Sequence, residues 1–176
     1  DHLDELAKKT SELKNLKKTS KIIALTFKDD TLIERLKKLG FANSKRITEK
    51  EDLKITKKNA NIETIQSKIT KKTIKELVKK HGKQDVLIAR HILEHTYSVN
   101  EFIDSLKEFI SEDGYIILEV PNFEQTLLNN EYPSIWEEHI TYFTQTTLKS
   151  MLKLKELKSV FFNNYYYPLE DSIVVI

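Results

Sequence analysis

Cysteine, glycine and long apolar runs are scarce or missing in this chain of 176 residues. The absence of cysteine excludes disulfides and thiolate metal sites, and it favours a reducing cytoplasm. No apolar run approaches the roughly 20 residues of a membrane span, so we expect no membrane partner. The sequence has three glycines, and none of them lies between Ile22 and Thr31. The chain starts at Asp1 without Met, which suggests a piece of a longer protein.

Charge is abundant, and it is divided unevenly along the chain. Charged residues make up 32% of the sequence and hydrophobic residues 39%, as in ordinary globular proteins. Residues 1–84 carry 23 Lys/Arg and 12 Asp/Glu, whereas residues 85–176 carry 6 and 15. A basic half can attract nucleic acid, but only three of the 29 basic residues are Arg. Lys offers a point charge and cannot form the bidentate hydrogen bonds by which Arg recognises phosphates and bases. We therefore expect a solvated lysine-rich surface and no nucleic-acid partner.

Short apolar segments alternate with amphipathic ones, which predicts strands separated by helices. The predicted helices are Leu3–Leu16, Thr31–Leu39, Thr70–Lys80, Asn100–Ile110 and Thr144–Leu154, the last with Thr144 as N-cap. The predicted strands are Lys21–Leu25, Ile62–Ile65, Asp85–Ala89, Tyr115–Val120, Ser159–Phe162 and Ser172–Ile176, with a turn at 111–114. This alternation indicates an α/β fold with a mostly parallel sheet and helices on both faces.

The strand ends are the places to look for a site, because ligands of such sheets bind beyond the carboxyl ends of the strands. After one predicted strand, His91 to His95 fit the spacing H-x-x-E-H. On a helix, His91 and His95 would share one face and could bind zinc, with Glu94 activating its water. Because the segment follows directly on a buried strand, we favour a turn with one histidine facing a pocket, and we expect no metal.

Three segments of the second half resemble one family. They are Asp-Val-Leu-Ile-Ala-Arg-His-Ile-Leu-Glu-His at 85–95, Ser-Glu-Asp-Gly-Tyr-Ile-Ile-Leu-Glu-Val-Pro at 111–121, and Trp-Glu-Glu-His-Ile-Thr-Tyr-Phe at 136–143. They are similar to the SAM-dependent nucleotide-sugar C-methyltransferases, which methylate the carbon next to the ketone of a nucleotide-linked keto-deoxysugar. The resemblance implies a Rossmann-like class I methyltransferase fold over 1–176. We expect one domain with an N-terminal helix (1–20), a cofactor-binding half (21–84) and a catalytic-like half (85–176).

The resemblance also implies the catalytic residues His95, Glu138 and His139. Methylation next to a ketone needs a base that removes a proton and a group that stabilises the enolate. His139 is the expected base, with Glu138 orienting it. Trp136 stands where the family usually has Tyr, and an indole cannot accept a proton.

The cofactor-binding half departs from the family pattern of a strand, an acidic residue and a glycine-rich turn. Asp29 and Thr31 keep the pattern. The degenerate positions carry side chains that would crowd a cofactor laid against the backbone: Ala24 for the acidic residue, Thr26 and Asp30 for glycines, Lys28 for a small residue and Thr48 for the ribose-binding acid. The adenine anchor falls near Ser67, and Glu170-Asp171 replace a glycine pair.

Two functions of different class follow. Because several separate contacts to one ligand are lost, we expect no cofactor and a pseudo-methyltransferase that interacts with, or regulates, another protein or domain. The alternative is an active C-methyltransferase with SAM as cofactor and a nucleotide-sugar as substrate. Two further hypotheses are an enzyme that enolises or epimerises a keto-sugar without SAM, and a zinc hydrolase built on His91.

Overall fold

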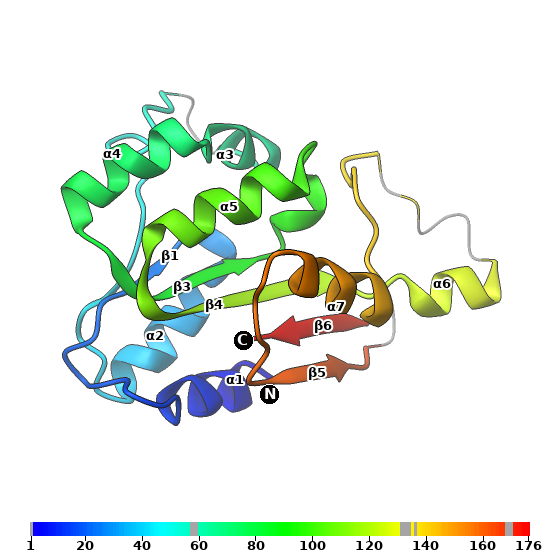
Figure 1. The fold of residues 1–176 in the computed structure, drawn as a ribbon, viewed down its shortest axis with the longest axis horizontal. Coiled ribbons are helices and arrows are strands. Elements are labelled where there is room, and N and C mark those ends of the chain that lie inside the picture. Colours follow the sequence, from blue (N-terminus) through cyan, green and yellow to red (C-terminus); the bar gives the residue numbers. More distant parts are fainter. Residues whose placement is uncertain (1, 57–59, 131–134, 136, 168–170) are drawn as a thin grey trace.

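The computed structural model describes residues 2–56, 60–130, 135, 137–167 and 171–176, and it is an α/β fold (Figure 1). Six strands of this described chain form one sheet in the order β2-β1-β3-β4-β6-β5. The strands are β1 (Ile22–Ala24), β2 (Ser44–Arg46), β3 (Gln84–Arg90), β4 (Ile110–Pro121), β5 (Phe162–Tyr165) and β6 (Ser172–Val175). From β2 to β4 the pairs are parallel, and β6 is antiparallel to both β4 and β5. The predicted mostly parallel sheet is confirmed.

Helices cover both faces of the sheet, as predicted (Figure 1). They are α1 (His2–Ser11), α2 (Asp30–Lys38), α3 (Ile62–Lys68), α4 (Lys71–His81), α5 (Val99–Phe109), α6 (Glu124–Asn129) and α7 (Gln145–Leu154), with 3-10 turns η1 (Phe27–Asp29) and η2 (Leu93–His95). Leu87 of β3 belongs to the hydrophobic cluster under α3, α4, α5 and α7, whereas its neighbours Val86 and Ile88 pack with α1 and α2. None of the described helices is long and apolar enough to cross a membrane.

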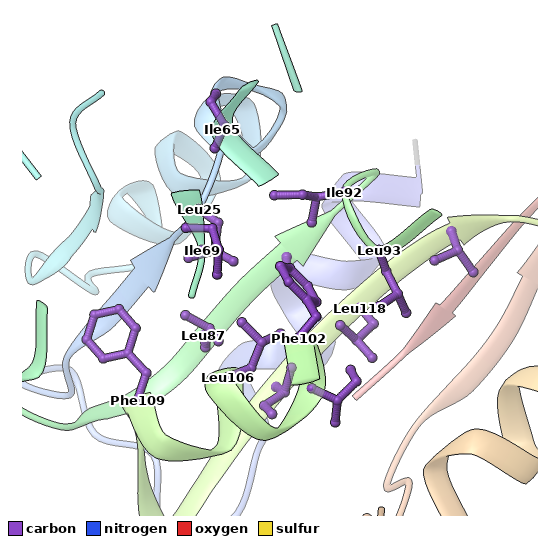
Figure 2. Packing of buried hydrophobic residues seen from close by; sticks show 14 of the residues in the cluster. Leu25, Ile65, Ile69, Leu87, Ile92, Leu93, Phe102, Leu106, Phe109 and Leu118 are labelled. Carbon is purple, nitrogen blue, oxygen red and sulfur yellow. The ribbon is translucent and has the colours of Figure 1, made fainter. Parts of the chain in front are cut away.

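The larger cluster holds the carboxyl ends of β3 and β4 in place. Phe102, Leu106 and Phe109 of α5 are at most 2% exposed and belong to the same cluster as Leu87 and Leu118 (Figure 2). Burying side chains of this size contributes about 1.5–3 kcal/mol each. The strand ends that carry the site therefore rest on a well-packed layer.

Two predicted helix ends are confirmed by their caps. Thr144 caps α7, since its hydroxyl accepts a hydrogen bond from the Thr147 amide at 3.2 Å. Gly40, with a φ of +94°, lies just beyond the end of α2. That backbone conformation costs glycine little and other residues more.

The predicted strand Ile62–Ile65 is wrong, because these residues begin α3. The Asn61 side chain accepts a hydrogen bond from the Thr64 amide, which caps a helix. The buried side chains of this segment, Ile62, Ile65 and Ile69, follow a spacing of three and four rather than the spacing of two that a strand requires.

Ser67 is therefore not at the end of a strand. It lies on the exposed side of α3, and its hydroxyl donates to the Thr64 carbonyl. In the described chain β2 forms the edge of the sheet at this side, so the adenine anchor predicted at Ser67 has no strand end to hold it.

Three other boundaries differ from the prediction. The predicted helix Leu3–Leu16 ends at Ser11, whose hydroxyl bonds back to the Lys8 carbonyl and competes with the helical ladder. The turn predicted at 111–114 lies inside β4. The pairing of β4 with β3 shifts register at this segment, so the strand continues through the predicted turn with an irregularity. The strand predicted at Ser159–Phe162 begins only at Phe162, where pairing with β6 starts.

Candidate functional site

A cavity of about 630 Å³, here called the β3–β4 pocket, opens at the carboxyl ends of β3 and β4. The predicted catalytic residues His95, Glu138 and His139 all line it. The remaining lining residues are Lys28, Asn61, Ile62, Glu63, His91, Glu94 and Pro121. The structure thus brings together the three residues that the sequence predicted for the pocket.

His95 closes η2, and one of its ring nitrogens is already bound. Nδ1 of His95 lies 2.9 Å from the Glu138 carbonyl and 3.1 Å from Oε1 of Glu63. A carbonyl oxygen can only accept, so we assign the proton to Nδ1, which leaves Nε2 with a lone pair. The His95 ring meets the His139 ring edge-on, with 5.0 Å between centroids.

Glu94 ties η2 to the loop that carries His139. Its backbone carbonyl accepts hydrogen bonds from the amides of Ile140 and Thr141, at 2.8 and 3.0 Å. Its side chain is 2% exposed, with Oε1 lying 3.7 Å from Nδ1 of His91. The other oxygen, Oε2, has no hydrogen-bond partner among the described residues. Leaving a buried carboxylate oxygen without a partner costs free energy.

His139 has the protonation state that a base requires. Burial lowers the pKa of His139 below its ordinary value of 6.5, against the opposing charge of Glu94. The ring is therefore neutral near pH 7 and can accept a proton. The side chain of Glu138 is exposed, and it is the backbone carbonyl of Glu138 that holds His95.

Glu119, which was not predicted from the sequence, is the centre of a buried charge cluster behind the β3–β4 pocket. Glu119 lies on β4 and is 1% exposed. Its carboxylate lies 2.5 Å from Nε of Arg90, 3.2 Å from Nε2 of His91, 2.8 Å from the Ser172 hydroxyl and 3.2 Å from Nε2 of His2. The signal in the sequence was a single acidic residue inside the apolar strand at 116–120.

The members of this cluster shift one another's pKa values. Burial alone would raise the pKa of Glu119, but the contacts with His2 and His91 and the charge of Arg90 hold it well below its usual range. Burial alone would lower the pKa of His91, but its bonds to Glu119 and Glu94 raise it to about 9. The cluster is therefore charged and internally compensated at neutral pH.

The helical H-x-x-E-H arrangement considered for zinc is not formed. His91 has a φ of +49° and stands between β3 and η2, so it does not share a helical face with His95. The Nε2 atom of His91 contacts Glu119 instead. The zinc hydrolase hypothesis built on His91 loses its geometric basis.

The turn after β1, where the family pattern expects glycines, is closed on itself. The amide of Thr26 donates to the Asp29 side chain, and the amide of Lys28 donates to the Thr26 hydroxyl, both at 3.2 Å. The amide of Asp29 donates to the Thr26 carbonyl at 3.1 Å, and that of Asp30 to the Phe27 carbonyl. In nucleotide-binding turns such amides reach the ligand. Here these four are used within the turn.

Arg90 lies against this turn. The strand order reverses between β1 and β3. Sheets of this kind bind ligands beyond the strand ends at such a point, which is here called the β1–β3 crevice. Arg90, 4% exposed, donates from Nη1 to the Lys28 carbonyl at 2.9 Å and from Nε to Glu119. Asp29 is fully buried 3.9 Å from Arg90, and burial raises the pKa of Asp29 to about 7.

The other degenerate positions are held by structural contacts. Ala24 is fully buried in β1, and the Asp30 side chain accepts a hydrogen bond from Arg46 at 2.9 Å. The amide and hydroxyl of Thr48 both bind the carboxylate of Asp52, at 2.7 and 3.2 Å. Asp52 also binds Lys80 and His81. Although burial opposes it, these bonds hold the pKa of Asp52 well below its usual range.

Two sequence predictions fall on residues outside the described part of the chain, namely Trp136 and Glu170. Asp171, the second half of the predicted glycine replacement, is described. Its carboxylate lies 3.3 Å from the Tyr167 amide and 3.4 Å from Nδ2 of Asn164.

Comparison with known proteins agrees with this geometry. A sequence model described as the methyltransferase domain matches residues 44–160, which is more than half of the chain. The chain belongs to the methyltransferase domain family. The C-methyltransferase NovU from Streptomyces niveus is 26% identical over 99 residues. That match covers 56% of this chain and 24% of NovU, so the chain spans about a quarter of this relative's length.

Solved methyltransferases share the fold over nearly the whole chain. Magnesium protoporphyrin IX methyltransferase (ChlM) from Synechocystis PCC 6803, solved with bound SAH, superposes with a TM-score of 0.56 at 9% identity, covering 99% of this chain and 80% of ChlM. A SAM-dependent methyltransferase from Archaeoglobus fulgidus gives 0.56 at 14% identity, covering 99% and 92%. These similarities confirm the predicted class I methyltransferase fold.

Proposed function

We propose that this domain does not bind SAM and acts as a pseudo-methyltransferase. The observation that carries the proposal is the β1–β3 crevice. The amides of Thr26, Lys28, Asp29 and Asp30 are used within the turn, and the buried Arg90 side chain bridges Lys28 and Glu119.

The energies favour this proposal. Displacing Arg90 would break a buried ion pair, which typically costs about 3–5 kcal/mol. Opening the turn would remove several hydrogen bonds at about 0.5–1.5 kcal/mol each. A ligand with a micromolar Kd supplies about 8 kcal/mol in total. Reopening the crevice would therefore consume most of the binding free energy of such a ligand.

The corresponding role is an interaction with another protein or domain, which the domain would stabilise or regulate. The relative NovU is about four times as long as the segment it shares with this chain. A cytoplasmic location stays a prediction from the absence of cysteine.

Calorimetric titration with SAH tests the proposal, with ChlM titrated in parallel as a protein solved with SAH. We expect no heat of binding and no thermal shift at millimolar SAH. Binding of SAH in the micromolar range would overturn the proposal.

The second candidate is an active SAM-dependent C-methyltransferase acting on a nucleotide-linked keto-deoxysugar. The β3–β4 pocket favours it, since His95, Glu138 and a neutral His139 meet there as proton chemistry requires. Incubation of a nucleotide-linked keto-sugar in deuterated water separates the possibilities. Methyl transfer with SAM supports this candidate, whereas deuterium uptake without SAM, abolished by His139→Ala, supports an enolising enzyme.

A further inference from the structure

Glu94, His95 and His139 converge on one point of the β3–β4 pocket. Each offers one ligand atom, and these atoms all lie within 4.8 Å of one another. In a tetrahedral zinc site with bonds of about 2.1 Å, ligand atoms are separated by about 3.4 Å. Closing the site around an ion therefore requires side-chain shifts of only about 1 Å.

The convergence is built into the backbone rather than left to mobile side chains. Glu94 and His95 lie on η2, and the Glu94 carbonyl accepts the amides of Ile140 and Thr141. Those two residues directly follow His139 in the chain. The same hydrogen bonds that hold the loop against η2 therefore bring the second histidine to the first.

The unsatisfied carboxylate oxygen of Glu94 is an independent observation that indicates a ligand. Its side chain is 2% exposed, and its Oε2 atom has no hydrogen-bond partner among the described residues. Buried polar atoms of native proteins are nearly always satisfied. A cation bound to Oε2 would remove the cost of this unsatisfied carboxylate oxygen.

The surroundings of His95 have the form found around metal-binding histidines. Nδ1 of His95 faces the Glu138 carbonyl at 2.9 Å and the Glu63 carboxylate at 3.1 Å. A histidine that binds a metal usually donates its other ring N–H to such a carbonyl or carboxylate, which fixes the tautomer. Nε2 of His95 is then the nitrogen that carries the lone pair for a metal.

We propose that Glu94, His95 and His139 bind one divalent transition-metal ion, with zinc as the best fit. Two imidazoles and one carboxylate form the ligand set of zinc sites that keep a fourth position open. The cavity of about 630 Å³ supplies the space for that position. This site is not the H-x-x-E-H arrangement, since His91 turns to Glu119. It goes beyond the proposed function and does not depend on whether SAM binds.

Metal titration of the chelator-treated protein tests this site. We expect calorimetry to show one zinc ion per chain with a Kd in the micromolar range or below, and cobalt to give the visible absorption of a low-coordinate site. Glu94→Gln and His139→Ala should each weaken zinc binding by more than about 100-fold, because each removes a direct ligand. Circular dichroism checks that both variants are folded.

Glu138→Gln is the matched control, because it removes the same charge from a side chain that lines the same pocket outside the ligand set. It should bind zinc as the wild type does. The site is refuted when the wild type binds no zinc, or when Glu138→Gln and Glu94→Gln lose affinity equally. Should His139→Ala fail to fold, the isosteric Glu94→Gln with the cobalt spectrum still decides the outcome.

Discussion

The β1–β3 crevice and the β3–β4 pocket lie side by side at one edge of the sheet, yet they differ in their polar groups. In the crevice, the amides of the turn and the Arg90 guanidinium bind partners within the protein, and the one unsatisfied oxygen of the turn, Oδ1 of Asp29, lies 3.9 Å from Arg90. In the pocket, Glu94 leaves a buried oxygen unsatisfied next to two histidines and a large cavity. The crevice therefore holds its own cation beside its buried carboxylate, whereas the pocket places its buried carboxylate beside two histidines and open space.

The two regions meet at the end of β3. Arg90 donates to the Lys28 carbonyl in the crevice, whereas its neighbour His91 lines the pocket, and both side chains contact Glu119. The left-handed backbone of His91, with a φ of +49°, makes this change of direction possible. Non-glycine residues adopt this conformation at a cost, and such costs concentrate at functional sites.

Arg90→Met should produce the largest change, because it removes the side chain that closes the crevice. It leaves the buried carboxylate of Glu119 without its nearest partner, so we expect the free energy of unfolding to fall by about 3–5 kcal/mol in urea titration. The control is Arg35→Met, which breaks a pair with the 65% exposed Asp4 and should cost less than about 1 kcal/mol. Equal losses would mean that the crevice is not held by charge.

Asp29→Asn tests the crevice through pH. Folding raises the pKa of Asp29 from 3.8 to about 7, so its contribution to stability is complete at low pH and is lost as pH rises toward about 7. Relative to Asp29→Asn, the wild type should lose free energy of unfolding between about pH 4 and pH 7, by roughly 4 kcal/mol for three pKa units. The raised pKa of His91 acts at higher pH, between about 6.5 and 9. Parallel curves from pH 4 to 6 would contradict the buried state of Asp29.

Zinc should raise the free energy of unfolding by binding in the pocket, whereas SAH should leave it unchanged. At a concentration 100-fold above its Kd, a ligand of the folded state adds about 2.7 kcal/mol to the free energy of unfolding. We expect this gain with zinc, reversed by a chelator, and no gain with SAH. Measured by denaturant titration, stabilisation by SAH alone would reverse the assignment of the closed and the open region.

Lys28→Ala should have the smallest effect, although Lys28 lies at both regions. The contact of Lys28 with Arg90 uses its backbone carbonyl, and that carbonyl is kept in the variant. We expect the free energy of unfolding to change by less than about 0.5 kcal/mol. A loss as large as that of Arg90→Met would show that the Lys28 side chain, and not the backbone, closes the crevice.

Much of the fold could be predicted from local sequence patterns. The apolar run of β3, the amphipathic spacing of α2 and α5, and the Thr144 cap were all readable because the period and the cap are properties of neighbouring residues. Two elements were not predicted in this way. The helical signal of Ile62–Ile65 lay in the Asn61 cap and in Ile69, outside the predicted strand, and the short strand β2 was not predicted.

By itself, the sequence determined the α/β class, the methyltransferase resemblance and the lack of glycine after β1. Tertiary structure alone decided where the charges went. Glu119 gathers His2, Arg90 and His91 from distant parts of the chain, and backbone bonds to Glu94 bring His139 to His95 across 44 residues. No local period encodes such contacts, because they depend on which strand ends the folded sheet places side by side.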